Sequence, residues 1–226
     1  MHLLPRLYAI ARLIPLGSRV ADVGTDHGYL PVWLIAEGIC PFVVATDVAS
    51  GPLETAKRSA ARMGLVPGPD FRLADGLDAI SPQEVDTVVM AGMGGETIQG
   101  MIGRAPWLRA GAHRMVLQPQ SKIPELVDFL ANAGYRIEDQ HLVEEAGRIY
   151  TIFEVTPGVM EPPAGGLRYV TRSLLERGDP LLGPYLAGIA DKLRRAIQGL
   201  EQAENGAEKR MEFARALAEL EQWRGV

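Results

Sequence analysis

The chain has 226 residues, 47% of them hydrophobic, and a formal net charge of −5, so it can bury a sizeable core and is not disordered by composition. No apolar run reaches the roughly 20 residues of a membrane-spanning helix, and the N-terminus lacks a secretory cleavage pattern, so we expect no membrane association. The single cysteine, Cys40, excludes an internal disulfide and predicts a reducing, cytoplasmic environment.

From residue 19 onward, short apolar segments alternate with segments of helix length. Strand alternating with helix at this spacing predicts right-handed βαβ units and a parallel sheet. The expected strands are rich in Val, Ile, Leu or Met and end in Gly, Pro or polar residues; they are 19–24, 42–47, 71–75, 86–92 and 113–118. The expected helices are 29–38, 51–63, 95–103 and 122–133.

The following segment has a different pattern. Residues 135–145 and 148–156 are two strand-like runs joined tightly at Gly147, which predicts an antiparallel pair. The expected fold class is therefore α/β, with a mostly parallel Rossmann-like sheet whose last strand is antiparallel. This is the kind of sheet that methyltransferases use, whereas dinucleotide-binding enzymes have an all-parallel sheet.

A Pro/Gly-rich linker at 157–166 predicts a boundary between a domain at 1–157 and a helical domain at 158–226. Beyond it, apolar residues from Leu186 to Leu200 recur every three or four positions, as they do again from Phe213 to Leu220. Two amphipathic helices around an Asn205-Gly206 turn predict an antiparallel coiled-coil hairpin.

Basic residues are concentrated in two acid-free stretches, although the net charge is negative. Residues 1–21 contain arginines and no acid, and the same holds between Glu96 and Glu125. This segregation lets an acidic protein present a basic face to phosphates, although ordinary solvated surface is the simpler interpretation. The arginines that we expect to bind a polyanion are Arg6, Arg12, Arg104 and Arg109.

The stretch ADVGTDHGYLP at 21–31 leads from an expected strand into an expected helix. A strand that ends at Asp22 and turns at Gly24 places backbone amides at the carboxyl edge of the sheet, the usual ligand crevice of open α/β sheets. Asp26 in this turn would repel a pyrophosphate, which argues against the alternative of a NAD-dependent oxidoreductase. S-adenosylmethionine (SAM) has a positive sulfonium and no phosphate, so the loop predicts a SAM site.

Acids also end the next two strands. Asp47 suits two ribose hydroxyls, and Asp75, followed by Gly76 and Leu77, suits the amine of adenine. For each acid alone, a turn-forming or helix-capping role is a common alternative. The predicted cofactor site consists of Asp22, Gly24, Thr25, Asp26, Asp47, Val48, Asp75, Gly76, Leu77 and Ala91.

The fourth strand ends in AGMGG at 91–95, where methyltransferases acting on exocyclic amines present Asp or Asn before two prolines. Adjacent glycines let a flat group approach the backbone, which suits a ring nitrogen such as N1 of adenine. Asp26, with His27 beside it, can stabilise a base that becomes cationic; the alternative is that Asp26 only anchors the amino group of SAM. The stacking surface that a flipped base needs is assigned to Tyr29 or Trp107.

The motifs DVGTDHGYLP, GPLETA, ADGLDAI, AGMGG, LQP and NAGYRI, with GRIYTI and DPLLGPYL, resemble the bacterial tRNA (adenine-22 N1)-methyltransferase family from about residue 4 to the C-terminal helices. The resemblance implies SAM as methyl donor, S-adenosylhomocysteine as product and adenine 22 of tRNA as target. It also implies catalytic roles for Asp26, His27, Tyr29, Gly92, Met93 and Gly94. Gln120 replaces the family's usual Asn after the fifth strand, and we expect it to keep a substrate contact.

Other functions remain open from the sequence. A SAM-dependent methyltransferase acting on another RNA or on a protein is one alternative, and a non-catalytic SAM-sensing RNA-binding module is another. None of the four histidines has metal-ligand spacing, so we expect no metal. No obligate protein partner is indicated.

Overall fold

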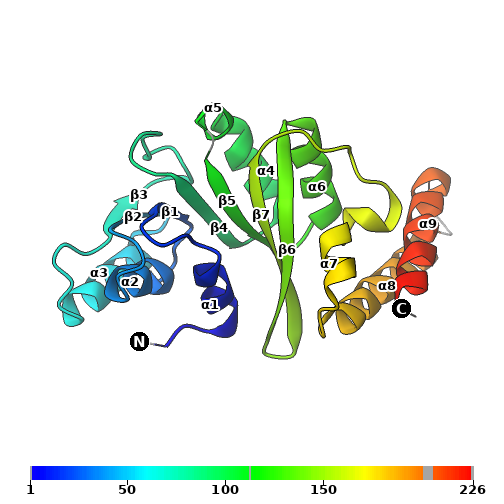
Figure 1. Ribbon diagram of the computed structural model, residues 1–226, viewed down its shortest axis with the longest axis horizontal. Helices are drawn as coiled ribbons and strands as arrows, with labels where there is room; N and C mark the ends of the chain where they lie inside the picture. Colours follow the sequence, from blue (N-terminus) through cyan, green and yellow to red (C-terminus); the bar gives the residue numbers. More distant parts are fainter. Residues whose placement is uncertain (1, 112, 201–205, 225–226) are drawn as a thin grey trace.

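The structure, a computed structural model, describes residues 2–111, 113–200 and 206–224. One sheet of seven strands runs through it in the order β3-β2-β1-β4-β5-β7-β6 (Figure 1). Neighbours among β1 to β5 are parallel, and β7 is antiparallel to both β5 and β6, which confirms the predicted fold class. The strands are β1 (Arg19–Val23), β2 (Phe42–Asp47), β3 (Asp70–Leu73), β4 (Thr87–Met93), β5 (Arg114–Pro119), β6 (Tyr135–Glu145) and β7 (Arg148–Pro157).

The four predicted helices of the sheet region are present, with ends shifted by a few residues at most. They are α2 (Tyr29–Ala36), α3 (Ser50–Arg62), α4 (Gly95–Arg104) and α6 (Ile123–Asn132). Short helices that the sequence analysis did not predict are α1 (Pro5–Arg12), α5 (Trp107–Ala110), the 3-10 turn η1 (Gly165–Arg168) and α7 (Arg172–Arg177).

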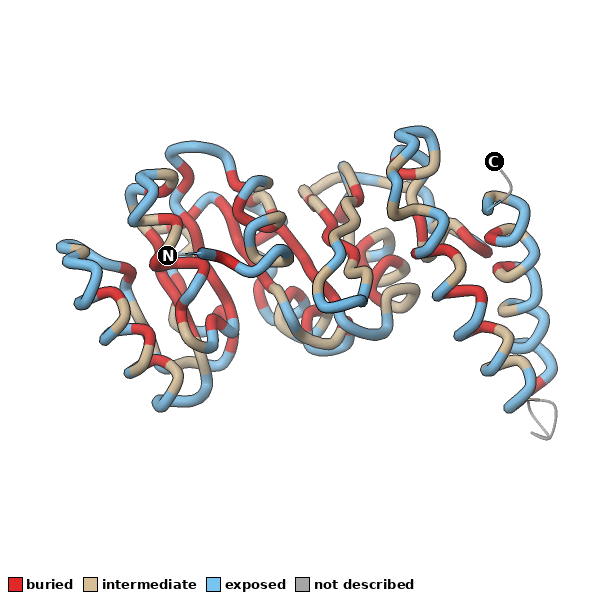
Figure 2. The backbone as a smooth tube through the Cα atoms, turned by 90° about the horizontal axis from the view of Figure 1, so that it is seen from below, coloured by how far each residue is buried: buried red, intermediate tan, exposed pale blue. Residues whose placement is uncertain are grey.

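Each strand of the sheet sends successive side chains to opposite faces, so the sheet separates two hydrophobic cores. On one face, Val20, Val43 and Val89 pack with α1 and α2. On the other face, the next residues along the same strands, such as Ala21 and Val44, pack in the core that α4 and α6 cover. Figure 2 shows long buried segments along the central strands and exposed residues on the outer sides of the helices.

The C-terminal helices α8 (Leu182–Leu200) and α9 (Ala207–Trp223) pack side by side, as the predicted hairpin requires. Asn205 of the predicted turn lies outside the described residues. A third core joins these helices to η1 and α7, and Leu142 of β6 and Ile149 of β7 pack against it. The helical segment is thus built onto the β6–β7 hairpin, at the end of the molecule opposite α3 (Figure 1).

The strands β1 to β3 extend the sheet to one side of β1, whereas β4 and the later strands extend it to the other side. In open α/β sheets, ligands bind outside the carboxyl ends of the strands where the order reverses in this way. The loops after β1 and β4 lie there. Among the described helices, none combines the length and apolar character that crossing a bilayer demands.

Candidate active site

The loop after β1 is fixed to the end of β2 by its backbone. The N–H groups of Gly24 and Thr25 both donate to the carbonyl oxygen of Thr46 at 2.9 Å. Gly24 and Gly28 have positive φ, and a Cβ on Gly28 would lie 2.5 Å from the Cβ of Ala56, so only glycine allows the loop to approach α3 here. These contacts set the path of the residues between the two glycines.

Asp22 is buried beneath this loop, with 5% of its surface exposed. Its Oδ2 accepts a hydrogen bond of 2.6 Å from the Thr25 hydroxyl. Burial raises the pKa of Asp22 to about 6, more than the Thr25 hydrogen bond lowers it, and the charge of Asp47 raises it further. A nearby cation would reverse this effect and favour the carboxylate, so the position suits a positively charged ligand.

Asp47 braces the turn and thereby orients Asp26. Its Oδ2 accepts from the Asp26 N–H and its Oδ1 from the Ala49 N–H, both at 2.9 Å. Asp26 has φ 53°, in the left-handed region that side chains other than Asn and Asp rarely adopt. The Asp26 side chain remains 70% exposed, and its Oδ1 lies 3.6 Å from Nε2 of His27.

β4 ends in a bulge at Gly92, between Ala91 and Met93. Gly92 has φ 78°, and its N–H donates to Oε1 of Gln118 at 3.1 Å. A Cβ on Gly95 would lie 2.6 Å from the carbonyl oxygen of Lys122, so this glycine lets the loops after β4 and β5 touch through their backbones. The Gln120 N–H donates to the Met93 carbonyl at 2.9 Å and joins the same two loops.

Gln118, Arg6 and Glu145 form a polar support that the sequence analysis did not assign. Gln118 is completely buried in β5, and its Oε1 also accepts from Nη1 of Arg6 at 2.9 Å. The Arg6 N–H donates to Oε2 of Glu145 at 2.9 Å, and its guanidinium lies over the Tyr150 ring. α1 is therefore attached both to the loop after β4 and to the end of β6. The LQP motif was the one sequence signal pointing to Gln118.

A cavity of about 430 Å³ lies between these loops and α1. Of the predicted site residues, it brings together Arg6, Asp22, Gly24, Thr25, Asp26, Tyr29, Ala91, Gly92 and Gln120. The sequence analysis missed Leu4, Leu7 and Leu30 in its lining, since the helix that carries Leu7 was not predicted. Arg6 thus lies in the cavity wall, with 18% of its side chain exposed, rather than on the open surface expected of a phosphate contact.

The residues assigned to the adenosine end lie outside this lining, around the ends of β2 and β3. Thr46 donates through its hydroxyl to the Gly76 carbonyl at 2.8 Å, while Val48 is 70% exposed and Leu77 is buried. Asp75 pairs with Arg104 at 3.3 Å, and both side chains are more than half exposed. Met93 and Gly94 belong to the loop after β4 without lining the cavity.

Trp107 and Arg109 lie on α5. In Figure 1, α5 is at the top of the molecule and α1 is at the lower side, so the two helices lie near opposite ends of the strands. Arg109 is exposed and donates to the Ala133 carbonyl at 3.3 Å. Trp107 packs edge to face on His113, with ring centroids 4.8 Å apart. The structure therefore does not bring either residue to the cavity, and of the two residues proposed for stacking only Tyr29 lies there.

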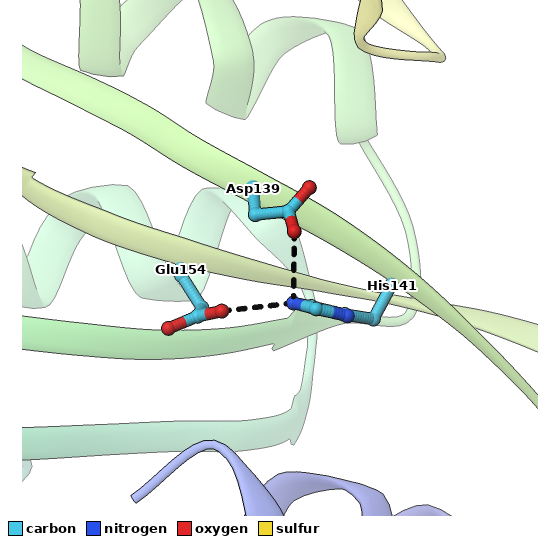
Figure 3. A group of neighbouring side chains, drawn as sticks. All are labelled: Asp139, His141 and Glu154. Atoms are coloured by element: carbon cyan, nitrogen blue, oxygen red, sulfur yellow. Dashed lines mark hydrogen bonds and ion pairs between the residues drawn. The ribbon is translucent and has the colours of Figure 1, made fainter. Parts of the chain in front are cut away.

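A separate polar cluster joins β6 and β7 at Asp139, His141 and Glu154 (Figure 3). The three ligand atoms lie within 4.8 Å of one another, a spacing that the separate positions of these residues in the sequence did not reveal. His141 Nε2 lies 2.8 Å from Glu154 Oε1, and Glu154 also pairs with Arg114 at 2.5 Å. Asp139 pairs with Arg177 of α7. Because both acids already pair with arginines, the cluster is explained as a junction between the hairpin and α7.

Known proteins resemble this chain in sequence and in structure. A family model described as a methyltransferase domain matches residues 3–153. A Bacillus subtilis protein named tRNA (adenine(22)-N(1))-methyltransferase is 30% identical over 187 residues, covering 83% of this chain and 76% of that protein. The crystal structure of the B. subtilis M1A22 tRNA methyltransferase has a TM-score of 0.85 at 25% identity and covers 99% of both chains.

A second solved structure shows a ligand. It is a Streptococcus pneumoniae protein, described as a candidate tRNA (m1A22) methyltransferase, in complex with S-adenosyl-L-methionine. It has a TM-score of 0.83 at 28% identity and covers 97% of this chain and 98% of that one. The sheet, its glycine-rich loops and the family model define the chain as a methyltransferase. Within that class, it belongs to the tRNA (adenine(22)-N(1))-methyltransferase family, which confirms the resemblance found in the sequence.

Proposed function

We propose that the chain transfers a methyl group from SAM to N1 of adenine 22 in tRNA and releases S-adenosylhomocysteine. The observation that carries this proposal is the cavity that joins the two loops of the family's signature. Asp22, Asp26 and Tyr29 line it from the segment between the end of β1 and the start of α2, and Ala91 and Gly92 line it from the end of β4. The similarity to the B. subtilis protein over most of the chain supports the same reaction.

The residues fit a cationic cofactor, because the buried Asp22 and the exposed Asp26 both face the cavity. When bound, SAM supplies a methyl group made electrophilic by the positive sulfonium. We assign Asp22, Gly24, Thr25, Asp26 and Ala91 to the cofactor on the cavity side. At the ends of β2 and β3, we assign to it Asp47, Val48, Asp75, Gly76 and Leu77.

N1 of adenine has a free lone pair, so no base is needed to remove a proton before attack. The chain's own residues then have two tasks, which are to position the adenine and to stabilise the positive charge that it acquires. We assign stabilisation to the Asp26 carboxylate, with His27 beside it, and stacking to Tyr29. The backbone of Gly92, Met93 and Gly94 forms the surface that the flat base approaches.

The test is methyl transfer from labelled SAM to unmodified tRNA transcripts with adenine or guanine at position 22, followed by nucleoside analysis. We expect 1-methyladenosine only when adenine stands at that position. Methylated product from both transcripts would support methyltransferase activity but contradict position 22 as the target. SAM binding without product on either transcript would shift the proposal to another substrate or to a non-catalytic module.

The proposal includes tRNA as partner, a cytoplasmic location, where tRNA works, and no obligate protein partner. We expect tRNA affinity to fall steeply as the salt concentration rises. Each phosphate that the protein neutralises adds about 0.9 to the slope of log affinity against log salt concentration. Arg12 is exposed and makes no ion pair with another described residue, so Arg12→Gln should reduce the slope by about 1. Titration of tRNA binding at several salt concentrations checks this, and equal slopes would contradict it.

A further inference from the structure

Aromatic side chains lie partly exposed in a row that begins at the mouth of the cavity and leads away from it. Tyr29 lines the cavity and is 50% exposed, and its ring centroid lies 5.9 Å from that of His27. Trp33 follows one turn later on α2, and residues four apart share one side of a helix. The Trp33 ring meets Tyr8 of α1 edge to face, with centroids 5.9 Å apart, and Tyr8 is 46% exposed.

The first helix extends this row with an apolar and a basic group. Leu4, Tyr8 and Arg12 are spaced by four residues, so they lie along one side of α1, and all three are exposed. Leu4 also lines the cavity, so this side of α1 starts at the cavity and ends at Arg12. The core-facing side of α1 uses other residues, including the buried Ile10 and Ala11. These buried residues attach α1 to the sheet, and from the exposed side Tyr8 adds its edge-to-face contact with Trp33.

The charge of this surface suits a polyanion. Neither α1 nor α2 contains an acidic residue. Arg12 forms no ion pair with any residue in the described part of the chain, so its charge is available to a phosphate. Partly exposed rings interleaved with an unpaired cation, on two helices that contain no carboxylate, are the combination that binds single-stranded nucleic acid.

We propose that Leu4, Tyr8, Arg12, Tyr29 and Trp33 form a stacking surface for the unpaired nucleotides next to the target base. A base that leaves its stack to enter the cavity exposes the faces of its neighbours, and aromatic rings beside the cavity replace that lost stacking. Every base has a π face, so this surface accepts the neighbours without reading their sequence. The inference rests on the proposed function, because it assumes that the target adenine enters the cavity.

The test compares Tyr8→Leu, which keeps apolar bulk without an aromatic face, with Tyr8→Phe, which keeps the ring. We expect Tyr8→Leu to raise the KM for tRNA by about 5- to 150-fold, the range for loss of one stacked base. The kcat and the SAM affinity should not change, and Tyr8→Phe should behave as the wild type. Met63→Ala, at an exposed apolar residue that directly follows α3 and is not part of the row, is the matched control and should have no effect on KM.

A second measurement reports stacking directly and does not depend on turnover. A tRNA carrying 2-aminopurine next to position 22 should lose fluorescence when wild-type protein or Tyr8→Phe binds, and lose much less with Tyr8→Leu. Equal quenching and an unchanged KM for Tyr8→Leu would overturn the stacking surface. If the stacking surface is wrong but the proposed function is right, the wild-type protein still forms 1-methyladenosine on the adenine-22 transcript. If the proposed function is wrong, the wild-type protein forms no 1-methyladenosine.

Discussion

Burial sets the protonation of Asp22, and this has a consequence for stability. Its pKa in the folded chain is about 6, above the ordinary value near 3.8, so the folded state binds a proton more readily than the unfolded state. Between pH 4 and pH 6, the native state is therefore stabilised as pH falls, and the ionised carboxylate destabilises it above pH 6 by up to about 3 kcal/mol.

We expect the wild type, without ligand, to gain unfolding free energy relative to Asp22→Asn as pH falls from 7.5 to 4.5. Denaturant titrations of both proteins at these pH values measure the difference, and the variant removes the contributions of all other titrating groups. A constant difference across the range would contradict the raised pKa of Asp22.

Asp26 has an exposed carboxylate, whereas Asp22 is buried. We therefore expect different roles for the two acids. Asp26→Asn tolerates the left-handed backbone and removes only the charge. If the carboxylate stabilises the cationic base, kcat should fall by about 100-fold or more, while SAM affinity changes little. Single-turnover methylation and calorimetric SAM binding separate the two effects. Loss of SAM binding with normal turnover at saturating SAM would make Asp26 an anchor for the cofactor.

At the scale of single elements, β5 controls the loop after β4 through Gln118. Gln118→Leu leaves the part-buried Gly92 N–H and the Arg6 guanidinium without their shared acceptor, which costs about 1–3 kcal/mol of stability. Without Gln118, neither Arg6 nor the bulge at Gly92 is held in place. We expect kcat/KM to fall by about 10- to 100-fold, because the segment that faces the base is then misplaced.

Gln140→Leu is the matched control for this prediction. Gln140 is the other completely buried glutamine of the sheet. Its side chain accepts from the Thr171 N–H at 2.7 Å and does not line the cavity. Gln140→Leu should lower stability and leave kcat/KM near the wild-type value. Equal losses of activity in both variants would show that Gln118 contributes only to the fold.

The elements differ in how far the sequence could predict them. The central strands of the sheet are apolar runs, and the bounds of all seven strands were predicted within about two residues. The glycine-rich loops were located by their composition. α1 was missed because it has only eight residues and Leu4 at its N-cap offers no side-chain acceptor. The position of Arg6 depends on Glu145, 139 residues away, so charge along the chain could not show that it lines a cavity.

At the scale of the whole molecule, the C-terminal helices do not form an isolated core. Leu142 and Ile149 of the hairpin pack against the cluster that contains Leu174, which is fully buried. We therefore expect one cooperative unfolding transition for the regions 1–157 and 158–226, although the linker suggested two domains. Leu174→Ala should destabilise the whole chain by about 2–5 kcal/mol.

Calorimetry, combined with tryptophan fluorescence, checks this prediction. Trp33 and Trp107 report on the sheet region and Trp223 on α9. A Trp223→Phe variant and a double Trp33→Phe, Trp107→Phe variant should unfold with coincident transitions. Two separate transitions would establish 158–226 as an independently folding domain.

The single cysteine also has a practical use. Cys40 is 2% exposed in the core beneath α1 and α2, and burial, with a further contribution from the charge of Asp86, raises the pKa of its thiol to about 12. Thiol reagents attack the thiolate, so Cys40 should be inert until that core opens. The rate of labelling then measures how often the native protein opens, without denaturant. Because Cys40 does not react in the folded chain, a single cysteine introduced on the surface would be the one site that a thiol-reactive fluorescent probe labels.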